Sequence, residues 1–354
     1  MDLTEILALR SKPGAGIFMQ ITMRCPLSCA HCCTSSDLES EQHDESGFIT
    51  LAQSFKGHQP PELLLLTGGE PLLRPALVER LADLAHEAGT RVALLSGMFF
   101  ARKNQTPSSI TRALDKVDHF TASLDAYHEE EVSREAVFRV LEERLALGQS
   151  VSLQVTGLGP KDPYLIDLAE DIRHRFNDQV PALFGAVGAQ GRAEDWVSLP
   201  TRLADTATAA APCTMASWPV VNCEGQVLAC CNQKVIDGPA PQHLTLGTAG
   251  KDPWPMIRQR AERSEALRVI RTTGPHQLGI NLNQRPRCTG ACDACIQLSV
   301  STPEASDLTK VVKSRGFAVR EWLVAEMMGQ QGYGIREFNS LSHLGAKGVT
   351  ACVA

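Results

Sequence analysis

Short apolar runs alternate with amphipathic segments along the first half of the chain, and this alternation restricts the possible folds more than any other feature. The runs have the length and the β-branched content of buried strands. Strands that alternate with helices form βαβ units around a parallel sheet. Six runs carry the pattern, at residues 17–23, 62–67, 91–96, 119–124, 151–156 and 182–187.

The segments between these runs place apolar residues at helical spacing. We expect helices at residues 77–88, 108–114, 129–147 and 164–176. Six strand–helix units are too few to close an eight-stranded barrel. In parallel sheets the ligand site lies at the carboxyl ends of the strands, so the residues that directly follow each run are the first candidates for function.

Three cysteines follow the first run with the spacing C-x3-C-x2-C: Cys25, Cys29 and Cys32. Thiolates so close together can converge on one soft metal centre, because they suit zinc and iron–sulfur clusters. Three cysteines on a cluster of four irons leave one iron free for an exogenous ligand. A zinc loop that lacks its fourth ligand, or chance clustering, is the alternative. Cys33 has the wrong spacing and is expected to be dispensable.

A glycine-rich turn follows the second run. Gly68, Gly69, Glu70 and Pro71 stand directly after the buried strand predicted at residues 62–67. Glycines at the carboxyl end of a strand let the backbone approach a ligand closely. An ordinary Gly-Gly turn is the alternative for this motif taken alone.

Together, the triplet at Cys25, Cys29 and Cys32 and the Gly-Gly-Glu-Pro turn resemble the signature of the radical S-adenosylmethionine (SAM) superfamily. The resemblance implies a partial, open (β/α)6 barrel and a 4Fe-4S cluster whose free iron binds SAM. It implies that Gly68, Gly69 and Glu70 hold the SAM amino group. It further implies reductive cleavage of SAM to a 5′-deoxyadenosyl radical, which abstracts a hydrogen atom from the substrate.

Other positions match this family less fully. Ser123 and Asp125 follow the fourth run and resemble a pattern whose polar side chains contact SAM; a serine satisfied by backbone is the alternative. His31 stands where family members usually carry an aromatic residue, and its ring can still stack on adenine. Residues 188–193 resemble a Gly-Arg-Ala turn found after the sixth strand. The third run ends Ser-Gly-Met, where many members have Thr-Asn-Gly.

The second group of cysteines lies between residues 213 and 295. A β-hairpin with its turn at Glu224-Gly225 would bring Cys213 and Cys230 together, and a tight loop would add Cys292 and Cys295. This group resembles the SPASM/twitch extension of radical SAM enzymes, in its shorter form with one auxiliary 4Fe-4S cluster. Structural zinc is the alternative. A second auxiliary cluster is a further alternative, and some other cysteines can replace one of the four ligands: Cys223, Cys231 and Cys288.

The expected domains are a lead-in at residues 1–16, a barrel at 17–200, an auxiliary iron–sulfur domain at 205–300 and a helical tail at 304–354. The apolar residues of the tail are expected to pack against the barrel: Ala318, Val319, Trp322, Leu323 and Met327.

Composition excludes several classes. A net charge of −6 and the lack of a basic run interleaved with aromatics argue against a nucleic-acid partner. No apolar run approaches the ~20 residues of a membrane span, and no signal peptide is expected. Twelve cysteines without an export signal indicate metal ligation in a reducing cytoplasm rather than disulfides.

The reaction stays open at this stage. An auxiliary cluster can accept an electron from the substrate radical, which favours oxidation or cross-linking of a small molecule or a peptide. Return of a hydrogen atom by a free thiol, Cys223 or Cys352, would make the enzyme an epimerase. A non-catalytic iron–sulfur or zinc protein is the third reading. Reductive cleavage also requires an electron donor, such as flavodoxin or ferredoxin.

Overall fold

The computed structural model describes residues 1–57, 59–197, 212–284, 290–300, 308–331, 335–336 and 350–352. The expected boundary between the barrel and the auxiliary domain, and the candidate ligand Cys288, lie outside these residues.

Six parallel strands pair in chain order, each with the next. They are β1 (Gly16–Gln20), β2 (Leu63–Thr67), β3 (Arg91–Ser96), β4 (His119–Ser123), β5 (Ser150–Gly157) and β6 (Ala182–Ala186). The sequence therefore predicts all six strands correctly. The first expected strand continues three residues past the observed end of β1. Residues 21–23 lie beyond the strand, and Ile21 N donates to Thr67 O, at the end of β2, at 2.9 Å.

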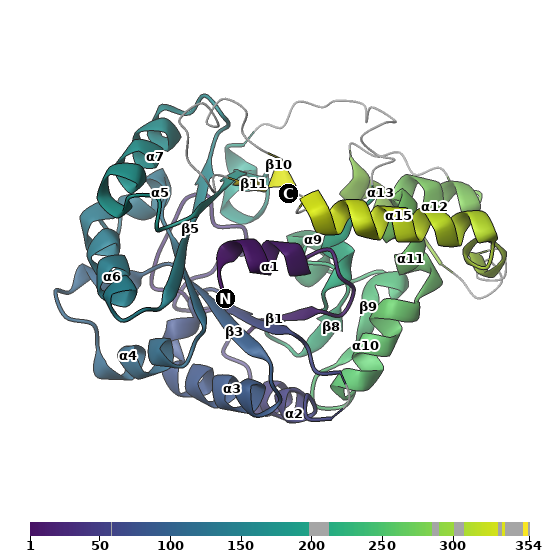
Figure 1. The fold of residues 1–354 in the computed structure, drawn as a ribbon, viewed down its shortest axis with the longest axis horizontal. Helices are drawn as coiled ribbons and strands as arrows, with labels where there is room; N and C mark the ends of the chain where they lie inside the picture. The colour runs from purple at the N-terminus through teal and green to yellow at the C-terminus, as the bar shows by residue number, and fades with distance from the viewer. Residues whose placement is uncertain are drawn as a thin grey trace.

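Helices cover the outer side of these strands and complete the α/β architecture of an open barrel (Figure 1). They are α2 (Ser46–Gln53), α3 (Pro75–Glu87), α4 (Ser108–Asp115), α6 (Arg134–Ala146) and α7 (Pro163–Phe176). The helix predicted at residues 129–147 is present from Arg134 to Ala146 but begins five residues later than predicted. The chain forms a short α5 (Ala126–Glu129) and then restarts as α6, because Ser133 Oγ accepts a hydrogen bond from Ala136 N and caps a new helix.

The second group of cysteines lies on a continuation of the same sheet. On the free edge of β1, β7 (Val220–Val221) pairs parallel, and β8 (Gln226–Leu228) and β9 (Thr245–Thr248) follow antiparallel. The hairpin expected around Glu224-Gly225 is thus present. At the other edge, β6 pairs with β11 (Thr350–Cys352), and β11 pairs with β10 (Ile335–Arg336). The two C-terminal strands were not expected in a helical tail.

The N-terminal segment contains a helix, α1 (Leu3–Leu9), that lies within the ring of strands (Figure 1). A capping box between Asp2 and Glu5 starts it. Ile6 and Leu9 pack with Leu63, Ala93 and Trp218 in a small core. The segment expected as a lead-in at residues 1–16 thus contains a helix that fills part of the barrel interior.

A cavity of about 200 Å³ remains between α1 and the strands, and we name it the barrel cavity. Its walls are formed by Leu3, Ile6, Leu7, Arg10, Phe18, Leu65, Thr67, Ala93, Leu94, Leu95, Thr121, Ser152, Leu153, Gln154, Leu183, Met215 and Trp218.

The remaining described helices cluster beyond β9. They are α9 (Gln233–Ile236), α10 (Trp254–Arg263), α11 (Glu265–Thr273), α12 (Pro275–Asn281), α13 (Ala291–Gln297) and α15 (Arg315–Gln331). No described helix has the combination of length and apolar character that a membrane span requires.

The expectation that an apolar stripe packs α15 against the barrel is wrong. Val319, Trp322 and Met327 are 58%, 61% and 54% exposed. The helix instead uses the neighbouring face, where Phe317 is buried and Glu321 forms an ion pair with Arg268 of α11 at 2.7 Å. Helical spacing alone identifies a stripe but does not identify which side meets the rest of the protein.

We predict that Gly16→Ala, at the first residue of β1, destabilises the protein. A Cβ at Gly16 would lie 2.5 Å from Trp218 Cδ2, and this indole is 1% exposed and cannot move aside. Overpacking of this kind costs about 1–3 kcal/mol in the free energy of unfolding, which urea denaturation measures. Gly188→Ala is the matched control, because a Cβ there meets nothing within 4 Å. Equal stabilities of the two variants would contradict the prediction.

Candidate active site

The cysteine triplet lies on the loop that leaves the carboxyl end of β1. Cys29 is 7% exposed, and Cys25 and Cys32 are half-buried. Cys32 N donates to Cys29 O at 3.2 Å, which forms a tight turn around the triplet. Cys33 is exposed. Burial raises the pKa of the Cys25 thiol to about 12, so this site favours a protonated thiol until a cation replaces the proton.

The turn after β6 binds this loop closely. Arg192, on the short helix η3 (Gly191–Asp195), donates from Nε to Cys29 O at 2.9 Å and from its backbone N to Cys32 O at 3.0 Å. A Cβ at Gly191 would collide with Cys32 O. The Gly-Arg-Ala resemblance marked this turn, but the sequence did not indicate that it contacts the cysteine loop.

The Gly68-Gly69 turn packs on the backbone that leads to the triplet. Gly69 N donates to Thr22 O at 2.7 Å, and Glu70 N donates to Arg24 O at 2.8 Å. A Cβ at Gly68 would collide with Thr22 O, and one at Gly69 would lie 2.5 Å from Arg24 O. Both glycines are thus required for close approach of two backbones, whether or not a ligand is bound.

The Glu70 carboxylate is completely buried below these turns. Its Oε1 accepts from Leu72 N at 2.9 Å and from Ser96 Oγ at 3.0 Å; its Oε2 accepts from Gly97 N at 2.8 Å and from the same hydroxyl at 2.9 Å. Burial raises the pKa of Glu70 to about 7 despite these donors. The carboxylate therefore joins the ends of β2 and β3, and Ser96-Gly97 supplies the contacts at this departure from the family pattern.

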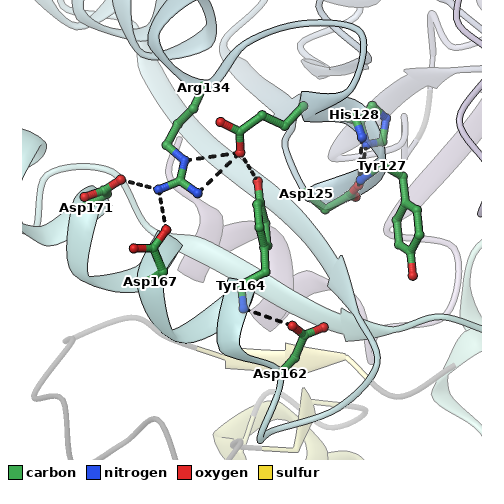
Figure 2. Close-up of polar contacts among 9 residues, drawn as sticks. Asp125, Tyr127, His128, Arg134, Asp162, Tyr164, Asp167 and Asp171 are labelled. Atoms are coloured by element: carbon green, nitrogen blue, oxygen red, sulfur yellow. Dashed lines mark hydrogen bonds and ion pairs between the residues drawn. The ribbon is translucent and has the colours of Figure 1, made fainter.

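Asp125 connects the cysteine loop to the end of β4, where Ser123 is the last residue of the strand. Asp125 Oδ2 lies 3.2 Å from His31 Nε2, and Oδ1 lies 3.0 Å from His128 Nδ1. Figure 2 shows His128 turned toward Asp125 from the first turn of α5. Burial would raise the pKa of Asp125, but the hydrogen bonds from His128 and His31 outweigh it and hold that pKa well below its usual range.

His128 also contacts a cysteine of the triplet. Burial would lower its pKa, but the interactions with Asp125 and with Cys29 raise the pKa to about 10, so the imidazole is held as a cation. A cation beside a cysteine favours the thiolate, which is the form that binds metal. No sequence motif indicates this role, since His128 lies on the helix after β4 and the triplet follows β1, three strands earlier.

Aromatic rings continue from His31 along the same edge. His31 stacks on Tyr127 with ring centroids 4.7 Å apart, and Tyr127 lies 5.4 Å from Trp196. Trp196 Nε1 donates to Ala30 O at 3.1 Å. His31 Nδ1 is buried and has no hydrogen-bond partner in the part of the chain that the structure describes.

A polar network on the outer side holds α5 in place (Figure 2). Arg134 binds Glu129 at 3.3 Å, Asp167 at 2.8 Å and Asp171, and Tyr164 Oη donates to Glu129 Oε2 at 2.6 Å. These contacts tie the end of α5 to α6 and α7, and thereby support the position of His128.

The second group of cysteines surrounds a small cavity of about 40 Å³, which we name the cysteine cavity. Its lining consists of Cys213, Ala216, Cys230, Asn232, Val235, Leu244, Ile270, Pro275, Ala291, Cys292, Cys295 and Ile296. All four predicted auxiliary cysteines are in this lining. Burial raises the pKa of each of these thiols, to about 11 for Cys292 and about 12 for Cys295. Four thiols around one void form a donor set that suits an iron–sulfur cluster or zinc.

The local structure around this cavity differs in part from the expectation. Cys292 and Cys295 lie on α13 rather than on a tight loop, and their i, i+3 spacing places them on one helix face. Cys213 is next to the short helix η4 (Thr214–Ser217), and its N donates to Ile270 O at 3.0 Å. His243 was not anticipated; its Nε2 lies 3.6 Å from Cys295 Sγ.

Three further cysteines had been candidates for other roles. Cys223 is half-buried in the turn between β7 and β8 and is absent from the lining of the cysteine cavity. Cys231 follows Cys230, and Arg10 Nη2 lies 3.8 Å from its sulfur. Cys352 is the last residue of β11.

Comparisons with known proteins agree with the motifs. Residues 19–172 match the family model of the radical SAM superfamily. The matched segment contains the triplet, the Gly-Gly-Glu turn and Asp125, which the structure brings to one edge of the sheet. The match to a radical SAM domain therefore covers residues 19–172 of the 354 residues of the chain.

Individual relatives are distant. YydG of Bacillus subtilis (strain 168), named as a peptide biosynthesis protein, is 24% identical over 129 residues, which cover 36% of this chain and 40% of YydG. The match therefore spans well under half of that relative. Among solved structures, anSMEcpe with bound AdoMet is 12% identical, with a TM-score of 0.47. The match covers 94% of this chain and 99% of the anSMEcpe chain. Streptococcus suis SuiB bound to S-adenosylmethionine is 11% identical, with a TM-score of 0.44. That match covers 62% of this chain and 59% of the SuiB chain.

We predict that Glu70→Gln keeps the iron content but lowers both stability and affinity for SAM. An amide in this place would direct an N–H group at Leu72 N or Gly97 N, and an unpaired buried donor costs about 1–3 kcal/mol. Urea denaturation and calorimetric titration with SAM measure the two effects. Ser96→Ala, which removes one donor and leaves both backbone donors, should be milder. An unchanged dissociation constant for SAM in Glu70→Gln would contradict a role in SAM binding.

We predict that Asp125→Asn destabilises the protein by about 3–5 kcal/mol, because it leaves the buried His128 cation unpaired. Asn keeps the oxygen that caps α5, while the negative charge and the second acceptor oxygen, which faces His31, are lost. Asp162→Asn is the matched control: Asp162 accepts from Tyr164 N at 3.0 Å and from Leu158 N at 2.9 Å. If urea denaturation gives equal losses for the two variants, the ion pairs of Asp125 do not stabilise the fold.

Proposed function

We propose that this protein is a radical SAM enzyme in which Cys25, Cys29 and Cys32 hold a site-differentiated 4Fe-4S cluster. One observation carries the proposal: at the carboxyl end of a parallel sheet, the Gly68-Gly69-Glu70 turn is hydrogen-bonded to residues 22 and 24, the backbone that leads directly into the triplet. When bound, the reduced cluster supplies one electron to the SAM sulfonium, and the resulting 5′-deoxyadenosyl radical removes a hydrogen atom from the substrate. A flavodoxin or ferredoxin is the proposed electron donor.

The residues at this edge divide into two roles. Gly68 and Gly69 keep the backbone close to the cluster loop, where the SAM amino group would bind. Ser123 ends β4 at the same edge of the sheet, and Asp125 caps the helix that follows. His31 offers a buried Nδ1 without a partner among the described residues, which fits a polar ligand at this place. Glu70 supports the loops from below.

We further propose that Cys213, Cys230, Cys292 and Cys295 hold one auxiliary 4Fe-4S cluster in a twitch-like domain at residues 205–300. Their common lining of the cysteine cavity supports this ligand set. Such a cluster can accept an electron from the substrate radical, and the reaction is then a net oxidation or cross-linking. Cys223 is a poor hydrogen donor for an epimerase, because neither the barrel cavity nor the cysteine cavity includes it among the described lining residues.

A peptide is the proposed substrate class. The support is the similarity to YydG, which is named for peptide biosynthesis. The barrel cavity is the proposed place for a segment of this peptide.

The decisive experiment compares the wild-type protein with the variant in which Cys25, Cys29 and Cys32 are all Ala. After anaerobic reconstitution we expect about eight iron and eight sulfide in the wild type, and about four of each in the variant, as two four-iron clusters require. With dithionite and SAM, only the wild type should form 5′-deoxyadenosine. Cys33→Ala, the neighbouring thiol of wrong spacing, is the control and should behave as wild type.

Two outcomes would overturn parts of this proposal. Formation of 5′-deoxyadenosine by the triple variant would remove the triplet from the reaction. About four iron with one zinc in the wild type would assign the cysteine cavity to structural zinc.

A further inference from the structure

Arg10 is a buried cation at the wall of the barrel cavity. It follows α1 and is 9% exposed. Its guanidinium lies between two aromatic side chains, with Cζ 4.8 Å from the ring centroid of Phe18 and 4.8 Å from that of Trp218. These rings stabilise the cation through their π faces and hold the guanidinium plane in one place.

The hydrogen bonds of Arg10 leave one side of the guanidinium unused. Nη2 donates to Met215 O at 3.4 Å and contacts Met215 Sδ at 3.7 Å. Nη1 is buried and has no partner in the described part of the chain. No carboxylate of the described residues forms an ion pair with Arg10, whereas buried Arg144 pairs with Asp115 and buried Arg271 donates to three backbone carbonyls. A buried charge and a buried N–H without a partner are both costly.

The rest of the barrel cavity is largely apolar. Leu3, Ile6 and Leu7 of α1 face Leu65, Leu95 and Leu183 of the strands across it. The cavity therefore combines an apolar body with one fixed cation whose donor is free. Arg presents a planar fork that matches a carboxylate.

We propose that Arg10 binds a carboxylate of the substrate, so that the barrel cavity accepts a peptide segment in which an acidic group adjoins an apolar residue. The acidic group is either an Asp or Glu side chain or a C-terminal carboxylate. This inference rests on the proposed function for the peptide class, and adds the charge and the place at which it is recognised.

One other assignment for Arg10 competes with this one. Its Nη2 lies 3.8 Å from Cys231 Sγ, so the guanidinium could serve only to neutralise thiolates beside the cysteine cavity. That role uses Nη2 and leaves Nη1 without a partner, whereas a carboxylate would use the free donor. The experiment separates the two.

The test measures peptide binding to the reconstituted holoenzyme with SAM, by anaerobic calorimetry without reductant. The probes are N-acetyl-Leu-Asp amide against N-acetyl-Leu-Asn amide, and N-acetyl-Leu-Leu with a free carboxyl against its amide. We expect one acidic probe to bind ~10-fold to ~100-fold more tightly than its neutral partner, as a charge-assisted hydrogen bond provides. The pair that discriminates identifies the source of the carboxylate.

Arg10→Gln should abolish this discrimination, and Arg10→Lys should retain part of it. Arg258→Gln is the matched control, because Arg258 binds Glu262 and Gln59 O and does not line the cavity. The visible absorption of the clusters and the affinity for SAM are measured on each variant.

The proposal is overturned if acidic and neutral probes bind equally to the wild type, a result that depends on no variant. It is also overturned if Arg10→Gln keeps the discrimination while losing cluster absorption or SAM affinity. Because binding is measured without turnover, a protein that discriminates the probes but does not cleave SAM would refute the proposed function and leave this inference standing.

Discussion

The backbone of residues 22–24 is the element on which the candidate site depends. These residues have left the sheet, so their carbonyls are free to accept from Gly69 and Glu70. The contact is between two main chains and tolerates no side chain at Gly68 or Gly69. It brings the loop after β1 and the turn after β2 to one place, and Glu70 extends the connection to the end of β3 through Ser96 and Gly97.

Charge completes this arrangement from the other side of the barrel. Arg192 binds the carbonyls of the cysteine loop, and Asp125 binds His31 and His128. Arg192 and the His128 cation thus lie against a loop that carries three thiols. Cationic groups favour thiolates, and they offset the negative charge that a thiolate-bound metal centre carries. The loop is therefore prepared electrostatically as well as sterically for a centre of this kind.

The two cysteine sites belong to a single sheet, because β7 pairs directly with the free edge of β1. Trp218, just before β7, packs against the α1 segment, and its Nε1 donates to Leu9 O at 3.1 Å. Arg10 follows in the chain and contacts both the barrel cavity and Cys231. The N-terminal helix therefore occupies the place where the barrel interior meets the cysteine-rich region.

The sequence by itself determined the six strands, most of the helices, and the two groups of thiols, because these depend on local periodicity, on spacing along the chain and on residue chemistry. It also identified the hairpin at Glu224-Gly225. The break between α5 and α6 escaped it, because Ser133 reads as an ordinary polar residue until its hydroxyl is seen to cap a helix.

Tertiary structure alone decided which distant groups meet. His128 contacts Cys29 across about 100 residues of chain, Arg192 contacts Cys29 across 163 residues, and Arg10 contacts Cys231 across 221 residues. It also decided that α15 buries Phe317 and leaves Trp322 exposed. The physical reason is the same in each case: local periodicity and spacing report neighbours within a few residues, whereas these contacts are selected by how the sheet curves and which loops its edge brings together.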